Sequence, residues 1–114
     1  MNNHMKHIIL NNNISCQLTK NELVNFLQTN KEYFKDKYGV HTIGLFGSYA
    51  KNKYTSTSDI DLIIIMEKDK KNLHNYLAFK NELEHILKRK VDIGFEHTIK
   101  KSIKDEILKD IIYV

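Results

Sequence analysis

The chain has 114 residues, of which 41% are hydrophobic and 28% are charged, and its formal net charge is +4. This length and composition predict one globular domain over residues 1–114, with a core that needs no disulfide or structural metal. The longest apolar run, at residues 62–66, excludes a membrane-spanning helix, which needs about 20 apolar residues. The single cysteine, Cys16, is typical of a reducing compartment, so we expect a cytoplasmic protein.

The first predicted element is a helix over residues 19–37. Thr19 and Glu22 have the spacing of a capping box, and apolar residues then recur at helical spacing until Gly39. Residues 1–17 show no comparable pattern, and we expect them to be peripheral or partly disordered.

The remaining predicted elements alternate between strands and helices. Short, partly β-branched apolar runs indicate strands, and apolar residues at helical spacing indicate helices. In chain order they are a strand in VHTIGLFG (40–47), a short helix in SYAKNK (48–53), a strand in SDIDLIIIMEK (58–68), a helix over 70–88, a strand in KVDIGFE (90–96), and a last helix capped by Ser102 and Asp105 that carries Ile103, Ile107, Leu108 and Ile111. This order predicts an α/β (α+β) fold in which about four helices cover a small three-stranded sheet.

Two aspartates stand at the start of the most apolar predicted strand. Because side chains alternate across a strand, Asp59 and Asp61 point to one face while Ile60 points to the other. Two like charges held this close repel each other, and a divalent cation between them removes the repulsion. The pair therefore predicts a site for a hard metal ion.

A third aspartate, Asp92, lies between Val91 and Ile93 in the last predicted strand. It reaches the same patch if this strand lies beside the one that carries Asp59 and Asp61. Three carboxylates can hold two Mg²⁺ ions, the arrangement that stabilises the attacking and leaving oxygens in nucleotidyl transfer. Asp92 is then a metal ligand, a base for the attacking hydroxyl, or both.

Gly47 and Ser48 end the first predicted strand and are separated from Asp59 by residues 49–58. A glycine at a strand end lets the backbone approach a ligand, and the serine offers its hydroxyl and an N–H group to a phosphate. The stretch is not a P-loop, because no Gly-Lys-Ser/Thr follows, and it lacks the further ligands of a calcium loop.

Other chemistry-bearing residues form no recognisable site. The lysines are spread along the chain, so we expect a solvated basic surface and no dedicated nucleic-acid site. The tyrosines are expected to pack in the core, except Tyr49 and Tyr54, which lie between the two halves of the motif and are candidates for contact with the nucleotide. No chemistry is assigned to the histidines, which are scattered as His4, His7, His41, His74, His85 and His97.

Together, Gly47-Ser48 and Asp59-Ile60-Asp61 in GLFGSYAKNKYTSTSDIDLIII resemble the signature of the polymerase-β-type nucleotidyltransferase superfamily, and in particular its minimal nucleotidyltransferase branch. The similarity runs from the first predicted helix through KVDIG to the closing EILKDIIYV. It implies a small mixed sheet flanked by helices. It also implies that the Gly-Ser pair holds the triphosphate of ATP and that Asp59, Asp61 and Asp92 hold two Mg²⁺ ions.

The resemblance also implies a partner. Many members of this branch are antitoxins that accompany a HEPN ribonuclease toxin, and some transfer AMP from ATP onto a tyrosine of the toxin. The chain departs from the family pattern at Lys51 and Asn52, where Arg-Gly is usual. Asparagine tolerates the left-handed conformation of a glycine, but a lysine makes no bidentate contact with a phosphate.

Three functions remain open at this point. A chain this small has little material for an acceptor pocket, which favours transfer of AMP onto another protein, the HEPN-type toxin. The same motif also occurs in enzymes that modify small molecules such as aminoglycosides. The third function is that of an antitoxin that acts by binding alone.

Overall fold

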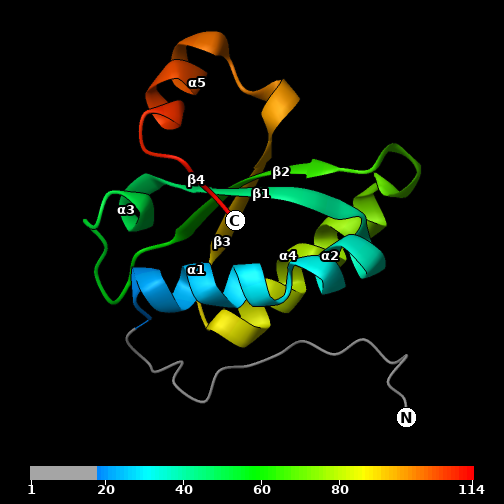
Figure 1. The fold of residues 1–114 in the computed structure, drawn as a ribbon, viewed down its shortest axis with the longest axis horizontal. Helices are drawn as coiled ribbons and strands as arrows, with labels where there is room; N and C mark the ends of the chain where they lie inside the picture. Colours follow the sequence, from blue (N-terminus) through cyan, green and yellow to red (C-terminus); the bar gives the residue numbers. More distant parts are fainter. Residues whose placement is uncertain (1–17) are drawn as a thin grey trace.

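The computed structural model describes residues 18–114, so the expectation for residues 1–17 lies outside the described part. Figure 1 shows the elements, which are α1 (Lys20–Thr29), α2 (Lys31–Tyr38), β1 (Val40–Phe46), α3 (Gly47–Ala50), β2 (Ile60–Met66), the 3₁₀ turn η1 (Lys68–Lys70), α4 (Leu73–Leu87), β3 (Val91–Phe95), the 3₁₀ turn η2 (Glu96–Thr98), α5 (Lys101–Leu108) and β4 (Ile112–Tyr113). The predicted α/β class is confirmed, although the first predicted helix is divided in two and a fourth strand is present.

The strands form one mixed sheet in the order β3-β2-β1-β4. β1 is antiparallel to both β2 and β4, whereas β2 and β3 are parallel. The parallel pair places the starts of β2 and β3 side by side, and the antiparallel pair brings the end of β1 next to the start of β2. One end of the sheet therefore collects the residues that follow β1 and those that begin β2 and β3.

The helices α1, α2 and α4 cover one face of the sheet, and Figure 1 shows them below the strands. Ile60, Leu62 and Ile64 of β2 belong to the core that these helices enclose, and each is 0% exposed. Within the same core the rings of Phe34 and Phe79 meet edge to face, with their centroids 5.1 Å apart. Because side chains alternate along a strand, this packing leaves the odd-numbered residues of β2 on the opposite face.

The predicted helix over residues 19–37 is interrupted at Asn30. This residue has φ −102° and ψ 12°, its side chain is 1% exposed, and its Nδ2 donates a hydrogen bond to the carbonyl oxygen of Phe26 at 2.9 Å. An asparagine that bonds to the backbone in this way competes with the helical hydrogen bonds. The predicted ends are confirmed, since Thr19 and Glu22 form the capping box and Gly39 ends α2 with φ 77°.

The C-terminal part differs most from the prediction. α5 begins after Lys100, which makes no side-chain cap, so the predicted cap by Ser102 and Asp105 is wrong. Ile111 lies beyond α5, and its side chain covers Gly44 of β1. The two-residue strand β4 was not predicted, because a segment this short carries no periodic pattern.

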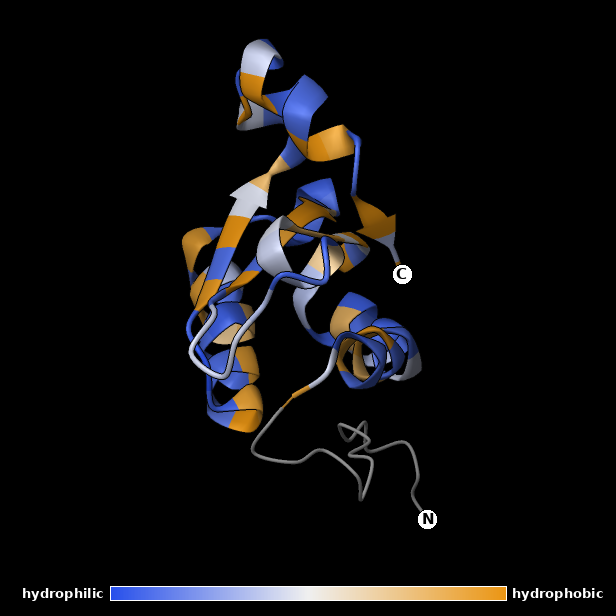
Figure 2. Cartoon of the chain, turned by 90° about the vertical axis from the view of Figure 1, so that its left-hand side faces the viewer, coloured by the Kyte–Doolittle hydropathy of each residue, from blue (hydrophilic) through white to orange (hydrophobic). Residues whose placement is uncertain are grey.

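α5 stands apart from the helical layer, on the other side of the sheet (Figure 1). None of its residues is buried, and Figure 2 shows hydrophobic and hydrophilic residues alternating along it. Within residues 18–114 no helix combines the length and the apolar character needed to cross a bilayer.

We expect Phe79→Ala to lower the free energy of unfolding by about 3–5 kcal/mol, because it leaves a cavity under the rings of Phe34 and Tyr38. Chemical denaturation monitored by circular dichroism measures this loss. The matched control on the same helix is Leu73→Ala, which is 71% exposed and should change stability by less than about 0.5 kcal/mol. Equal losses in the two variants would contradict the assignment of the core.

Candidate active site

Strand pairing brings the three aspartates to one end of the sheet. Asp61 pairs with Phe46, the last residue of β1, and with Asp92 in β3. Paired residues on neighbouring strands point to the same face, so the carboxylates of Asp61 and Asp92 are neighbours on the face opposite the helical layer. Asp59 immediately precedes β2, two residues before Asp61.

The turn at Gly47 lies against Asp61. Gly47 has φ +75°, and a Cβ atom at this position would collide with the carboxylate of Asp61. Glycine meets both requirements, because it adopts positive φ without strain and has no side chain. Ser48 follows as the second residue of α3. A phosphate bound by this turn would therefore lie next to the carboxylates.

The three carboxylates interact electrostatically. Burial raises the pKa of Asp61 above its ordinary value, and the negative charges of Asp92 and Asp59 raise it further. The cause is that a half-buried carboxyl group with two like charges nearby ionises at a cost in free energy. A cation among the three would remove this cost.

The donor set fits a hard divalent cation, although the side chains are not gathered around one point. Among residues 18–114, no three His, Cys, Asp or Glu side chains are arranged, as they stand, to hold a metal ion. Asp92 instead places its Oδ1 3.9 Å from Nζ of Lys90, and both side chains are more than half exposed. Mg²⁺ binds carboxylate oxygens. A positive charge among Asp59, Asp61 and Asp92 would offset their mutual repulsion.

The loop between α3 and β2 is fixed at both ends. Asn52 has φ +58°, so it adopts the left-handed conformation that was predicted for it. The N–H of Lys53 donates to the carbonyl oxygen of Ser48 at 2.9 Å. Further along, Nη1 of Arg89 donates to the carbonyl oxygen of Ser56 at 2.7 Å. The turn at Gly47 and the start of β2 are thus connected by an ordered segment.

Tyr49 and Tyr54 stack on each other, with ring centroids 4.3 Å apart. Tyr49 is 0% exposed and donates its hydroxyl to the carbonyl oxygen of Leu18. Tyr54 accepts a hydrogen bond from the N–H of Lys20. The prediction that Tyr49 contacts the nucleotide is wrong, because its ring is enclosed in the core. Tyr54 is half-buried, and its contact with the nucleotide stays a prediction.

The sequence did not reveal what lies on the other side of the Gly47 turn. A hollow of about 270 Å³ separates this turn from α5. Its lining residues are Phe46, Gly47, Lys51, Ile103, Glu106, Ile107 and Asp110. The apolar stripe of α5 was visible in the sequence, but periodicity does not say which element such a stripe faces.

Comparison with known proteins assigns the chain to a family. The family model described as "Nucleotidyltransferase domain" matches residues 27–114. The chain belongs to this family. It is a nucleotidyltransferase, as the Gly-Ser and Asp-Ile-Asp motif predicted.

Relatives and solved structures agree. This nucleotidyltransferase is 38% identical to a "Putative protein adenylyltransferase" of Methanocaldococcus jannaschii, over 84% of this chain and 98% of that protein. It is 29% identical to protein adenylyltransferase MntA of Thermococcus cleftensis, over 87% and 99% of the two chains. Among solved structures, a "putative minimal nucleotidyltransferase" is 25% identical with a TM-score of 0.62, over 78% of this chain and 93% of that one. A toxin-antitoxin structure with AMP-PNP has the same fold, with a TM-score of 0.58 at 20% identity, over 84% and 72% of the two chains.

We expect Gly47→Ala to destabilise the protein by at least about 1–2 kcal/mol, the cost of a left-handed alanine, and to displace Asp61. Nucleotidyl transfer should fall with it. Gly94→Ala is the matched control in β3, because a Cβ atom there would be 3.9 Å from Cδ1 of Ile99, an ordinary contact. Thermal melts and activity assays check both variants, and a fully active Gly47→Ala protein would contradict the close approach.

We expect Asp61→Asn to raise the melting temperature of the metal-free protein at pH 7. The folded protein keeps a proton on Asp61 up to a higher pH than the unfolded chain does, so the free energy of unfolding falls as the pH rises through the window between the two pKa values. Asparagine removes this loss, and the gain should vanish at a pH below the ordinary carboxyl pKa. Thermal melts as a function of pH measure it, with Asp69→Asn in the exposed turn η1 as the control. A lower melting temperature at pH 7 would contradict the repulsion.

Proposed function

We propose that this nucleotidyltransferase transfers AMP from ATP onto a tyrosine of a HEPN-type toxin and acts as its antitoxin in the cytoplasm. The observation that carries the proposal is the placement of Asp59, Asp61 and Asp92 at one end of the sheet, beside the Gly47 turn. Relatives named as protein adenylyltransferases support AMP as the transferred group and a protein as the acceptor. The toxin is chosen because a protein of the same fold occurs in a toxin-antitoxin structure with AMP-PNP.

The donor nucleotide would be held at the turn. Gly47 and Ser48 would bind the β- and γ-phosphates through backbone N–H groups and the serine hydroxyl, and Lys51 would add one positive charge. Asp59 and Asp61 would hold Mg²⁺, which when bound supplies positive charge to the phosphates and to the attacking oxygen.

The acceptor would approach from the side of Asp92. This carboxylate is more than half exposed, so a hydroxyl group from solvent can reach it. It would ligate Mg²⁺, accept the proton of the tyrosine hydroxyl, or do both. The phenolic oxygen forms a bond to the α-phosphorus while the bond from that phosphorus to the bridging oxygen breaks, and pyrophosphate leaves.

A small-molecule acceptor is less well supported. The relatives described above are named protein adenylyltransferases, which favours a protein as the acceptor. Binding without catalysis would follow if Lys51 and Asn52, which replace the usual Arg-Gly, distorted the turn. Asn52 adopts the left-handed conformation that a glycine would take, so the backbone of the turn is preserved and binding without catalysis is disfavoured.

To test the proposal, ATP labelled at the α-phosphate is incubated with the protein, Mg²⁺ and the protein encoded by the neighbouring gene, which the proposal expects to be a HEPN-type toxin. Label should appear on a tyrosine of the partner, and EDTA should abolish it. Asp59→Asn and Asp61→Asn should lower the rate by roughly 100-fold or more, the scale for losing a preorganised electrostatic contact, whereas Asp69→Asn should not. An unlabelled partner that the Asp59→Asn protein still neutralises would overturn the proposal in favour of binding alone.

A further inference from the structure

Tyr113 differs from the other tyrosines of the chain in its exposure. Residues 18–114 contain all six tyrosines, and only Tyr113 is exposed, at 48%. The others are Tyr33, Tyr38 and Tyr49, which are buried, and Tyr54 and Tyr76, which are half-buried. For an enzyme that modifies tyrosines, Tyr113 is thus the one accessible acceptor on its own surface.

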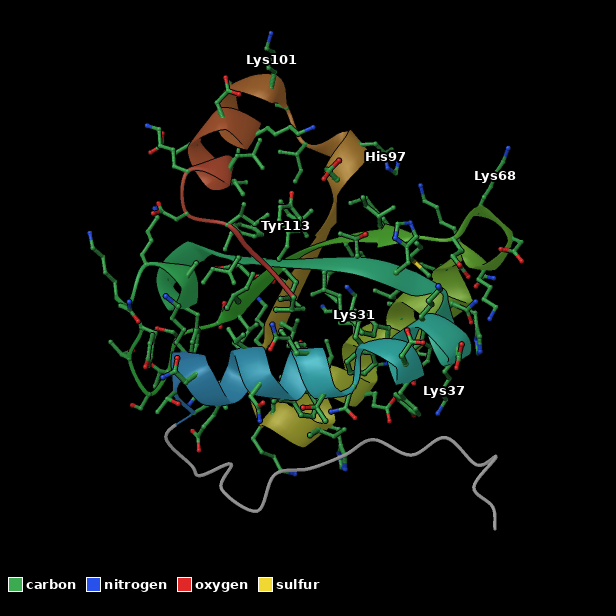
Figure 3. All side chains as sticks on the ribbon, viewed as in Figure 1. Lys31, Lys37, Lys68, His97, Lys101 and Tyr113 are labelled. Atoms are coloured by element: carbon green, nitrogen blue, oxygen red, sulfur yellow. The ribbon has the colours of Figure 1, made fainter. Side chains whose placement is uncertain are left out.

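Tyr113 also lies on the face that carries the aspartates. It pairs with Gly44 of β1, which lies two residues from Phe46, the partner of Asp61. The Tyr113 ring covers Gly44, because its Cε1 is 3.2 Å from where a Cβ atom of that glycine would be. Figure 3 shows Tyr113 on the α5 side of the sheet, away from the helical layer.

A carboxylate accompanies the Tyr113 hydroxyl. Oη of Tyr113 donates a hydrogen bond to Oε2 of Glu96 at 3.5 Å. Partial burial, the charge of Glu96 and this hydrogen bond raise the pKa of the phenol, so Tyr113 is protonated at neutral pH. A protonated phenol needs a base when it attacks phosphorus, and Glu96 is placed to be that base.

Within one molecule this hydroxyl does not face the aspartates. It points to Glu96, beyond the end of β3, and the strand from Asp92 to Phe95 is roughly 10 Å long. Tyr113 belongs to a two-residue strand at the edge of the sheet, where a second molecule has access to it. The geometry therefore favours transfer between molecules.

We propose that Tyr113 of one molecule is an acceptor of AMP for the active site of a second copy of this chain. This proposal rests on the proposed function. Oη of Tyr113 bonds to the α-phosphorus of ATP held by the second copy, the bond to the bridging oxygen breaks, pyrophosphate leaves, and the phenolic proton passes to Glu96. The product is an AMP-tyrosine phosphodiester on the exposed face next to β1.

The experiment uses two forms of the protein that can be told apart by mass. The acceptor form carries Asp59→Asn and Asp61→Asn and keeps Tyr113, and the donor form is catalytically intact but carries Tyr113→Phe. Both are incubated together with ATP and Mg²⁺, and intact-mass and peptide mass spectrometry locate the AMP. A free acceptor, N-acetyltyrosinamide, is included in a parallel reaction to measure transfer independently of Tyr113.

We expect AMP on Tyr113 of the acceptor form and at least ten-fold less on that form when it also carries Tyr113→Phe. Tyr76→Phe in the acceptor form is the matched control and should not reduce labelling. Glu96→Gln should slow labelling by about ten-fold or more, since a general base contributes ~10²–10⁴-fold. Tyr113→Phe should leave the rate on the free acceptor unchanged.

Three results would overturn the inference. An acceptor form that stays unmodified while N-acetyltyrosinamide or the HEPN partner is labelled rejects Tyr113 and leaves the proposed function intact. Labelling of Tyr113 in the wild-type protein alone, at a rate per molecule independent of protein concentration, while the acceptor form stays unlabelled, rejects transfer between copies. Absence of transfer to every acceptor, the partner included, rejects both the inference and the proposed function.

Discussion

The site depends on a register that holds three like charges together against their repulsion. If β2 slipped by one residue, Asp61 would move away from Asp92 and their repulsion would fall. The same slip would turn Ile60, Leu62 and Ile64 away from the core. Burial of each of these three side chains is worth ~1.5–3 kcal/mol, whereas two charges 4 Å apart near a protein surface repel each other by about 4 kcal/mol. The core therefore fixes the aspartates, and the raised pKa of Asp61 records the cost.

The motif residues were predictable because each belongs to a strong local pattern. Alternation placed Asp59 and Asp61 on one face, and the apolar neighbours of Asp92 placed it in a strand. That β3 lies directly beside β2, with Asp92 paired to Asp61, is a property of the sheet that no local pattern carries. The resemblance to minimal nucleotidyltransferases predicted that Asp92 joins the other two aspartates, because the resemblance implies the arrangement of the whole domain.

Where the predictions failed, tertiary contacts or weak signals were responsible. Asn30 interrupts a helical pattern because its side chain bonds to the backbone, which apolar spacing does not report. Tyr49 was expected beside the nucleotide because it lies between the two halves of the motif, yet it fills the core and stacks on Tyr54. β4 is too short to show alternation, so the exposed face next to β1 and the position of Tyr113 on it were found only in the structure.

A crystal structure with Mn²⁺ and a non-hydrolysable ATP analogue, in which anomalous scattering locates the metal, tests directly whether the three aspartates hold the ions. We expect metal peaks coordinated by carboxylate oxygens of Asp59, Asp61 and Asp92, at ~2.1 Å as for Mg²⁺, with the phosphates on the Gly47 turn. Anomalous density elsewhere, or none near these carboxylates while the analogue is bound, would contradict it.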